Sequence, residues 1–255
     1  MSSHAKPLSG HNILVTGASG AIGTAIVESL ASEGARPIIH YRRQREAAEA
    51  LADRVGGTGV LLQADLSDPA GAARLWDEAQ ASVGRIHGLV NNAGIRTTIA
   101  LDGDLSAWQE AWRQELQVNV LAAADLCRSA ILHFRAHGGG RIVNMASRAG
   151  QRGYVADAIP YGAAKAALNN ITKSIARSFG GEGVIAVAIA PGWVRSHMAD
   201  AYVAQASLAA AVGDIPIGVM AEPAEIAELV TFVMRSSQRS LNGATLDLNG
   251  GSYVR

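Results

Sequence analysis

Short hydrophobic runs alternate with longer amphipathic stretches along the whole chain. The short runs cover residues 12–16, 37–41, 59–63, 86–91, 141–146, 184–190 and 244–248. Several of them are nearly continuous in apolar character, as expected for strands buried on both faces of a parallel sheet. The stretches between them repeat apolar residues at the 3.6-residue period of a helix. These helical stretches cover residues 22–33, 45–55, 69–83, 105–134, 161–179 and 223–234.

This alternation predicts an α/β fold, in which right-handed strand–helix–strand units build a doubly wound parallel sheet of about seven strands. Pro69 and Pro223 fit the first turns of their helices, where a missing N–H costs little. The sequence shows no linker or internal repeat, so residues 1–255 are predicted to form a single domain. A connection of about thirty residues, 191–221, breaks the rhythm, and connections of that length are usually functional. Its alanine-rich part, 198–220, is predicted to fold over a pocket as a mobile lid.

Composition narrows the classes of protein that the chain can belong to. It has 255 residues, 49% of them hydrophobic, and its 22 basic residues equal its 22 acidic ones. A net charge of zero gives no electrostatic case for nucleic acid or anionic lipid as a partner. The only cysteine, Cys127, excludes an intrachain disulfide. Because no apolar run approaches the ~20 residues of a membrane helix and the first residues lack a signal core, we expect a soluble, cytoplasmic protein.

A glycine-rich turn follows the first predicted strand directly. Residues 16–23 read Thr-Gly-Ala-Ser-Gly-Ala-Ile-Gly, and a helix begins there. Small residues at such a turn let backbone N–H groups contact a pyrophosphate at the helix N-terminus. The same glycines would also serve a tight turn that needs only their backbone angles. A loop of this kind is only moderately specific for a dinucleotide by itself.

Further motifs follow this loop in order. They are Asn-Asn-Ala-Gly at 91–94, Asn119, Ser147, Tyr-x-x-x-Lys at 161–165, Pro-Gly at 191–192, and Leu-Asn-Gly and Asn-Gly-Gly at 241–243 and 249–251. With these motifs the chain resembles the classical short-chain dehydrogenases/reductases over nearly its full length, and among them the 3-oxoacyl-(acyl carrier protein) reductase-like members. Ala21 stands where the family's loop, Thr-Gly-x-x-x-Gly-x-Gly, has its middle glycine. The resemblance implies a Rossmann-type sheet of seven strands flanked by helices.

The spacing of Tyr161 and Lys165 suggests a tuned acid/base. Four residues apart on a helix, they lie on the same face, and a nearby ammonium lowers the pKa of a phenol. The alternative is a buried tyrosine beside a lysine that reaches out to solvent. The resemblance implies that Tyr161 exchanges a proton with the substrate oxygen, which Ser147 orients. It also implies that Lys165 lowers the tyrosine pKa and binds the nicotinamide ribose, while Asn119 holds a water in a proton relay.

The end of the second predicted strand bears on the choice of cofactor. Folds of this kind place an acidic residue there for the ribose 2′-hydroxyl of NAD, or an arginine for the 2′-phosphate of NADP. Here Tyr41 stands in the place of the acid, and Arg42 and Arg43 follow. Arginine suits phosphate by its charge and its planar fork, so the sequence favours NADP(H) and leaves NAD(H) as the alternative. The alternative is that these arginines only begin a helix and point into solvent.

The resemblance also assigns further contacts to the dinucleotide. Beside Tyr41, Arg42, Arg43, Tyr161 and Lys165, they are Gly17, Ser19, Ala21, Ile22, Gly23, Asp65, Leu66, Asn91, Ala93, Gly94, Pro191, Gly192, Val194 and Ser196. Loops at the carboxyl ends of the strands supply the candidate substrate residues Arg96, Arg148, Tyr154, Trp193 and His197. Several arginines around one pocket could favour an acidic group on the substrate, unless most of them point to solvent. The histidines show no metal-ligand spacing, so no metal is predicted.

These observations predict an NADP(H)-dependent oxidoreductase that interconverts a carbonyl and a secondary alcohol of a small molecule. One alternative is an NAD-dependent dehydrogenase of a sugar or hydroxy acid. Another is a nucleotide-sensing protein that has kept the fold and lost turnover. The resemblance further implies a homotetramer or homodimer.

Overall fold

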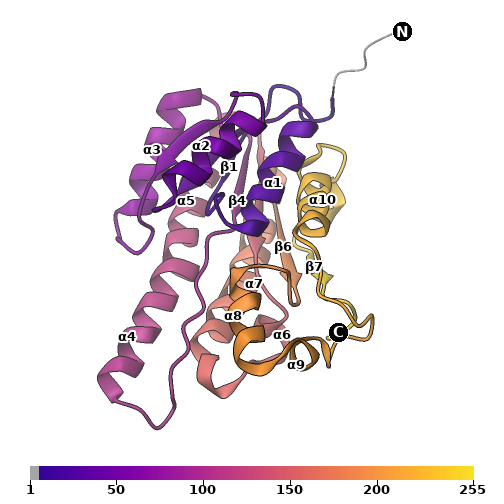
Figure 1. The fold of residues 1–255 in the computed structure, drawn as a ribbon. Coiled ribbons are helices and arrows are strands. Elements are labelled where there is room, and N and C mark those ends of the chain that lie inside the picture. Colours follow the sequence, from indigo (N-terminus) through magenta and orange to yellow (C-terminus); the bar gives the residue numbers. More distant parts are fainter. Residues whose placement is uncertain (1–5) are drawn as a thin grey trace.

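Seven parallel strands form one sheet, and helices cover both of its faces (Figure 1). The computed structural model describes residues 6–255, with all of their side chains except those of residues 197, 198, 201, 205 and 206. The strand order is β3-β2-β1-β4-β5-β6-β7, which confirms the predicted doubly wound sheet. The strands are β1 (Asn12–Val15), β2 (Arg36–Tyr41), β3 (Val60–Gln63), β4 (Gly88–Asn91), β5 (Gly140–Met145), β6 (Val184–Pro191) and β7 (Thr245–Leu248).

Helices connect consecutive strands. The α-helices are α1 (Ala21–Ser32), α2 (Arg45–Arg54), α3 (Gly71–Val83), α4 (Leu105–Leu116), α5 (Ala122–Ala136), α6 (Ala149–Arg152), α7 (Ile159–Phe179), α8 (His197–Ala206), α9 (Leu208–Val212) and α10 (Pro223–Met234). Short turns of other helix types are η1 (Gln117–Leu121), η2 (Ala156–Ala158), η3 (Gly180–Glu182) and η4 (Arg239–Leu241).

The order of the strands reverses between β1 and β4. Leu14 of β1 pairs with Ile38 of β2 on one side and with Leu89 of β4 on the other. In doubly wound sheets, ligands bind in the crevice outside the carboxyl ends of the strands at this reversal. The topology therefore selects one edge of the sheet for a site.

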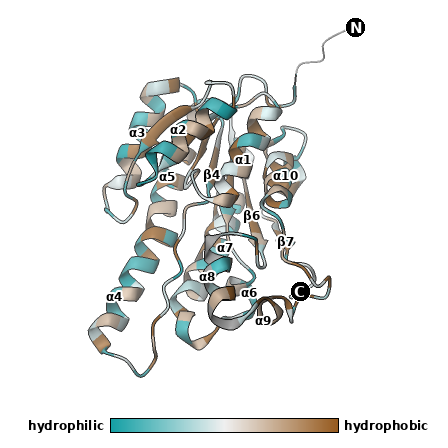
Figure 2. Cartoon of the chain, in the orientation of Figure 1, coloured by the Kyte–Doolittle hydropathy of each residue, from teal (hydrophilic) through white to brown (hydrophobic). Residues whose placement is uncertain are grey.

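Two apolar layers hold the helices to the sheet. Helices α1, α2 and α10 pack on one face through residues such as Ile26, Leu51 and Val230. On the other face α3, α5 and α7 contribute residues such as Trp76 and Phe134. Figure 2 shows hydrophilic positions recurring along α2, α3 and α4. This amphipathic pattern is the one that the sequence predicts from its 3.6-residue spacing.

The predicted long helix 105–134 is interrupted in the structure. Helices α4 and α5 are joined by η1, a π-helical turn that contains Asn119. Periodicity misses this feature, because one π turn adds a residue without ending the run of helical hydrogen bonds. Such turns occur often at functional sites.

The two prolines predicted at helix starts differ in outcome. Pro223 begins α10, where the side chain of Glu225 completes a capping box with Glu222. Pro69, in contrast, precedes α3, which starts at Gly71. The Asp68 side chain accepts from Ala70 N at 3.0 Å, so a turn held by aspartate occupies the place of the predicted first helical turn.

The long connection after β6 folds into two short helices, α8 and α9, at the end of the molecule where the strands finish (Figure 1). The ring of Trp193 stacks on that of Tyr202 in α8, with centroids 4.7 Å apart. Val194 and Ala221 form an isolated parallel bridge that closes the base of the connection. In residues 6–255, no helix has the length and apolar character needed to cross a membrane.

Candidate active site

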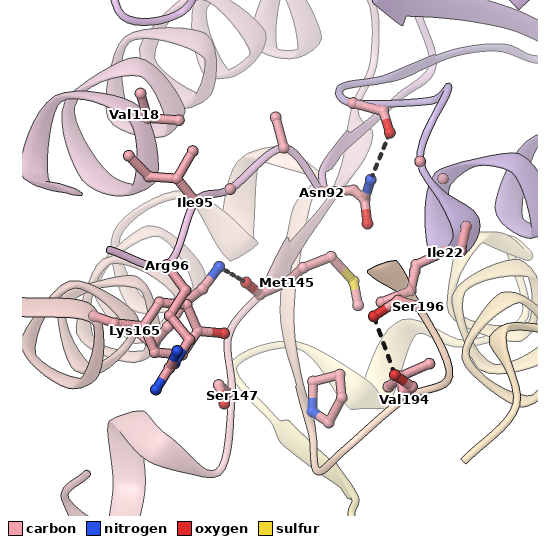
Figure 3. Close-up of a pocket in the computed structure, with 18 of the residues that line it drawn as sticks. Ile22, Asn92, Ile95, Arg96, Val118, Met145, Ser147, Lys165, Val194 and Ser196 are labelled. Carbon is pink, nitrogen blue, oxygen red and sulfur yellow. Dashed lines mark hydrogen bonds between the residues drawn. The ribbon is translucent and has the colours of Figure 1, made fainter. Parts of the chain in front are cut away.

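A cavity of about 600 Å³ opens at the carboxyl ends of the strands (Figure 3). Ser147, Tyr161 and Lys165 line it. So do most of the residues predicted for the cofactor, namely Gly17, Ser19, Ala21, Ile22, Gly23, Arg42, Arg43, Asp65, Leu66, Ala93, Gly94, Pro191, Gly192, Val194 and Ser196. Residues far apart in the sequence thus meet where the topology directs them.

Two predicted cofactor contacts, Tyr41 and Asn91, do not line this cavity. Tyr41 is 5% exposed and belongs to the core between α2 and the sheet. The Asn91 amide donates to Asn144 Oδ1 at 2.8 Å and to Cys127 Sγ at 3.3 Å, in a buried polar cluster. Because side chains alternate along a strand, the last residue points into the core in both cases, and the next residue, Arg42 or Asn92, reaches the cavity.

The glycine-rich turn fits a dinucleotide pyrophosphate. Gly17 has φ +62°, and a Cβ there would lie 2.9 Å from the backbone of Ala93. A Cβ on Gly23 would lie 2.3 Å from the Gly17 carbonyl oxygen, so both positions need glycine. Ala21 is the first residue of α1 and lines the cavity, which shows that a methyl group is accommodated where the family has its middle glycine. Among the described residues, no acceptor faces the N–H groups of Ala21 and Ile22, and such groups at a helix start bind phosphate.

Three polar residues that sequence reasoning missed hold this turn in place. His40 Nδ1 accepts from Gly17 N at 3.0 Å, while its other ring nitrogen faces the Ala64 carbonyl at 3.2 Å. Thr16 Oγ1 accepts from Asn92 N at 3.0 Å, and the Asn92 amide donates to Thr16 O at 2.9 Å. The signal in the sequence is their place at strand ends, beside the residues that line the cavity.

The predicted acid/base group comes together at the other end of the cavity. Lys165 is 5% exposed, and its ammonium donates to the Met145 carbonyl at 2.8 Å (Figure 3). The Lys165 nitrogen lies 5.7 Å from the centroid of the Tyr161 ring. Ser147 ends the segment after β5, and its oxygen accepts from Ala149 N at 3.1 Å at the start of α6.

The pKa values differ from the predicted tuning. Burial raises the pKa of Tyr161 to about 12, although the Ser147 hydroxyl acts in the opposite direction. Burial also lowers the pKa of Lys165 to about 8, against the charge of Glu115. Lys165 is not among the groups that shift the pKa of Tyr161, so the predicted lowering of that pKa by the lysine stays a prediction. A phenol with this pKa keeps its proton at neutral pH.

Asn119 is 1% exposed and does not itself line the cavity. Its Oδ1 accepts from Ile95 N and its Nδ2 donates to Ile95 O, both at 2.9 Å. A Cβ on Gly94 would lie 2.8 Å from Asn119 Oδ1 and 3.3 Å from Lys165 Nζ, so the glycine permits a close approach. Asn119 thus fixes the cavity wall at residues 94–95, and its predicted water-holding role stays a prediction.

Glu115 is a second residue that sequence reasoning missed. It is fully buried and accepts from Thr97 N and from the Asn119 amide. Burial raises the pKa of this carboxyl, and the Thr97 hydrogen bonds and the charge of Lys165 oppose the shift. An acidic residue within the apolar stripe of α4, four positions before Asn119, was the available signal.

The predicted substrate residues divide into three groups. Arg96, Tyr154 and Trp193 line the cavity. Arg148 also lines it, but its guanidinium is held by both oxygens of Asp214 at 3.1 and 3.2 Å. The side chain of His197 lies outside the described residues.

Comparison with known proteins identifies the family. The model of a family described as enoyl-(acyl carrier protein) reductase matches residues 17–253. The chain belongs to the short-chain dehydrogenase/reductase family. It is 32% identical, over 94% of its length and 96% of the other chain, to the 3-oxoacyl-[acyl-carrier-protein] reductase FabG of Escherichia coli.

Two other short-chain dehydrogenases/reductases are similarly related. One is a cis-4-hydroxycyclohexanecarboxylate dehydrogenase of Sinomonas cyclohexanicum, 33% identical over 93% of this chain and 94% of the relative. The other is a structure described as an NAD(P)-dependent gluconate 5-dehydrogenase from Beutenbergia cavernae with NADP bound at low occupancy. It has a TM-score of 0.88 and 33% identity over 98% of this chain and 99% of that one. The protein is therefore an oxidoreductase that acts on a carbonyl or alcohol group.

Proposed function

We propose that this enzyme is an NADP(H)-dependent oxidoreductase that interconverts a carbonyl and a secondary alcohol, with Tyr161 as its acid/base. The observation that carries the proposal is the shared cavity, in which Ser147, Tyr161 and Lys165 meet the glycine-rich turn and two arginines. When bound, the nicotinamide cofactor supplies or accepts the hydride, which no side chain can do.

The surroundings of Tyr161 support a role in proton transfer. With a pKa of about 12 its phenol keeps its proton at neutral pH, so it can protonate the alkoxide oxygen that forms when a carbonyl is reduced. The Ser147 hydroxyl is placed to orient the same oxygen. Lys165, fixed by the Met145 carbonyl, would bind the nicotinamide ribose.

The preference for NADP(H) rests on Arg42 and Arg43. Both side chains line the cavity directly after β2, where the adenosine ribose binds in such folds. No acidic side chain stands at position 41 to bind a free 2′-hydroxyl, since Tyr41 is buried in the core. A guanidinium at this place suits the 2′-phosphate by charge and by shape.

One observation favours NAD and the dehydrogenase alternative. Asp65 lies 3.2 Å from the Arg42 guanidinium, so part of that positive charge is already matched. The Sinomonas and Beutenbergia relatives are named as dehydrogenases of hydroxylated carboxylates, which agrees with oxidation of a sugar acid or hydroxy acid. The non-catalytic alternative has no such support, since the relatives are reductases and dehydrogenases.

A fluorescence titration with NADPH and with NADH tests the proposal. We expect NADPH to bind at least about 10-fold more tightly than NADH, and the Arg42→Ala and Arg43→Ala variants to lose that preference. Arg45→Ala is the matched control, because this exposed arginine pairs with Glu49 on α2. Tighter binding of NADH, unaffected by Arg42→Ala, would replace the proposal with the NAD alternative.

The role of Tyr161 is tested in the same preparation. Tyr161→Phe should bind NADPH as the wild type does and lose at least about 100-fold in turnover of any carbonyl that the wild type reduces. Full turnover by Tyr161→Phe would exclude this residue as the acid.

A further inference from the structure

The part of the cavity beside Ser147 and Tyr161 is cationic. Of the described residues that line the whole cavity, the one acidic side chain is Asp65, and it pairs with Arg42. Asp65 follows β3, four strands away from β5, which corresponds to roughly 19 Å across the sheet. No carboxylate among the described residues lines the substrate end of the cavity, and the one nearest to Arg96 is that of Asp157.

Arg96 is the cation at this end with unused hydrogen-bonding capacity. Its side chain is 12% exposed, and Nη1 donates to Thr98 Oγ1 at 3.1 Å. Nε is buried and, within residues 6–255, has no acceptor. Nη2 lies 3.8 Å from Asp157 Oδ1, beyond hydrogen-bond distance. The edge formed by Nε and Nη2, the one that binds carboxylates with two parallel hydrogen bonds, therefore has no hydrogen-bond acceptor among the described residues. The nearest anionic atom to it is Asp157 Oδ1, which is buried and also lacks a hydrogen-bond partner.

Aromatic contacts place this guanidinium beside the reacting group. Its central carbon lies 5.4 Å from the centroid of the Tyr154 ring, and the Tyr154 and Tyr161 centroids are 5.6 Å apart. The positive charge of Arg96 also acts to lower the pKa of Tyr161, against the larger effect of burial. Figure 3 shows Arg96 on the same side of the cavity as Ser147 and Lys165.

Arg148 differs from Arg96 because its charge is matched by a hydrogen-bonded carboxylate. It is 4% exposed, and Asp214 accepts from it with both oxygens. Its charge is used within the protein. Of the two arginines at the substrate end of the described cavity, Arg96 is the one whose guanidinium is not hydrogen-bonded to a carboxylate.

We propose that Arg96 forms a carboxylate-binding subsite, and that the substrate is a keto acid or hydroxy acid that carries its carboxylate away from the reacting carbon. This inference rests on the proposed function, because it takes the oxygen at Tyr161 as the reacting one. The carboxylate accepts from Nη2 of Arg96, and from Nε once a rotation of that side chain exposes it, while the carbonyl or hydroxyl oxygen lies at Ser147 and Tyr161. The planar fork of arginine selects a carboxylate over a neutral ester or amide.

Calorimetric titration of the enzyme saturated with NADP⁺ tests the subsite without turnover. The probes are cyclohexanecarboxylate and cyclohexanecarboxamide, which have similar size and differ in charge. We expect the carboxylate to bind at least about 10-fold more tightly to the wild type, as is typical of hydrogen bonds between charged groups. The preference should disappear in Arg96→Gln and fall to an intermediate value in Arg96→Lys. Asp157→Asn should strengthen carboxylate binding, because it removes the nearest competing charge.

Arg113→Gln is the matched control. This exposed arginine of α4 pairs with Glu110, and its substitution changes the net charge as Arg96→Gln does. Equal affinity for the two probes, weak binding of both, or a carboxylate preference that survives Arg96→Gln would each overturn the subsite.

A kinetic comparison separates this inference from the proposed function. Keto acids and their methyl esters are offered with NADPH, and kcat/KM is measured for wild type and Arg96→Gln. The subsite predicts at least about a 10-fold loss for the acids and little change for the esters. Reduction of esters and acids alike, with no effect of Arg96→Gln, would leave the proposed function standing and remove the subsite. Failure to bind NADPH would remove the proposed function. The calorimetric titration would then use the enzyme saturated with NAD⁺, and its result would still decide the subsite.

Discussion

Residues that line this cavity are held in place by side chains that do not line it themselves. Glu115 is the clearest case, because one carboxylate receives the amide of Asn119 and the backbone of Thr97. Both contacts fix the segment 95–97, which carries Ile95 and Arg96 into the cavity. The positions of the cavity-lining residues therefore depend on buried side chains behind them.

We expect Glu115→Gln to reduce kcat by at least about 10-fold with little change in NADPH affinity, because one of the two acceptors that hold the wall at residues 95–97 becomes a donor. A change in pH dependence should accompany the loss. Burial lowers the pKa of Lys165 to about 8, and the charge of Glu115 opposes that shift. Without the charge the lysine loses its proton at lower pH, so the alkaline limb of the kcat profile should move toward acid. Glu110→Gln on the exposed face of α4 is the control, and an unmoved alkaline limb would reduce Glu115 to a structural role.

At the level of elements, the alternation of hydrophobic runs was sufficient to predict the sheet and its helices. The glycine-rich turn, Ser147, Tyr161 and Lys165 were found as well, because their motifs are short and local. The π turn at Asn119 could not be found, since a single inserted residue leaves the helical pattern almost unchanged. The burial of Tyr41 also escaped prediction, because it depends on which way the last residue of β2 points.

The connection that carries α8 and α9 is tied down behind the catalytic serine. Asp214, after α9, accepts from Arg148 and lies 2.9 Å from the Arg152 guanidinium at the end of α6. Although burial opposes the shift, these arginine contacts hold the pKa of Asp214 below its ordinary value. These ion pairs therefore connect the predicted lid to the segment that positions Ser147.

Loss of the ion pairs of Asp214 should lower the stability of the protein. Asp214→Ala leaves the buried Arg148 without a partner, and we expect the free energy of unfolding to fall by about 2 kcal/mol in urea denaturation. Arg152 is more exposed, so Arg152→Ala should cost less than about 1 kcal/mol. Limited proteolysis should then cut the segment 207–218 first in Asp214→Ala. Equal losses in the two variants would show that Arg148 does not depend on Asp214.

For the whole molecule, the family resemblance implies a homotetramer or homodimer, and the surface of α4 to α5 offers apolar side chains for such an interface. Leu121 and Leu132 are about half exposed there, at 51% and 50%. Beside them, Cys127, Ile131 and Phe179 line a shallow apolar groove between α5 and α7. Exposed apolar surface of this kind commonly marks an interface.

Light scattering should give a mass of about four times the 26.4 kDa of one chain. Leu132→Asp should shift the protein to smaller species, because a carboxylate would be buried in the interface. Leu208→Asp on α9, at a leucine of similar exposure, should leave the mass unchanged. A single-chain mass for the wild type would contradict the expected assembly.

The buried polar cluster at Asn91 has one practical consequence. Cys127, the only thiol of the chain, is 2% exposed within it, and burial raises its pKa to about 12. Its thiolate population at neutral pH is negligible, so alkylating dyes should not label the native enzyme. A cysteine introduced at Ala204, on the exposed side of α8, would be the sole reactive thiol, and a fluorophore attached to it would report motion of that helix without removal of the native residue.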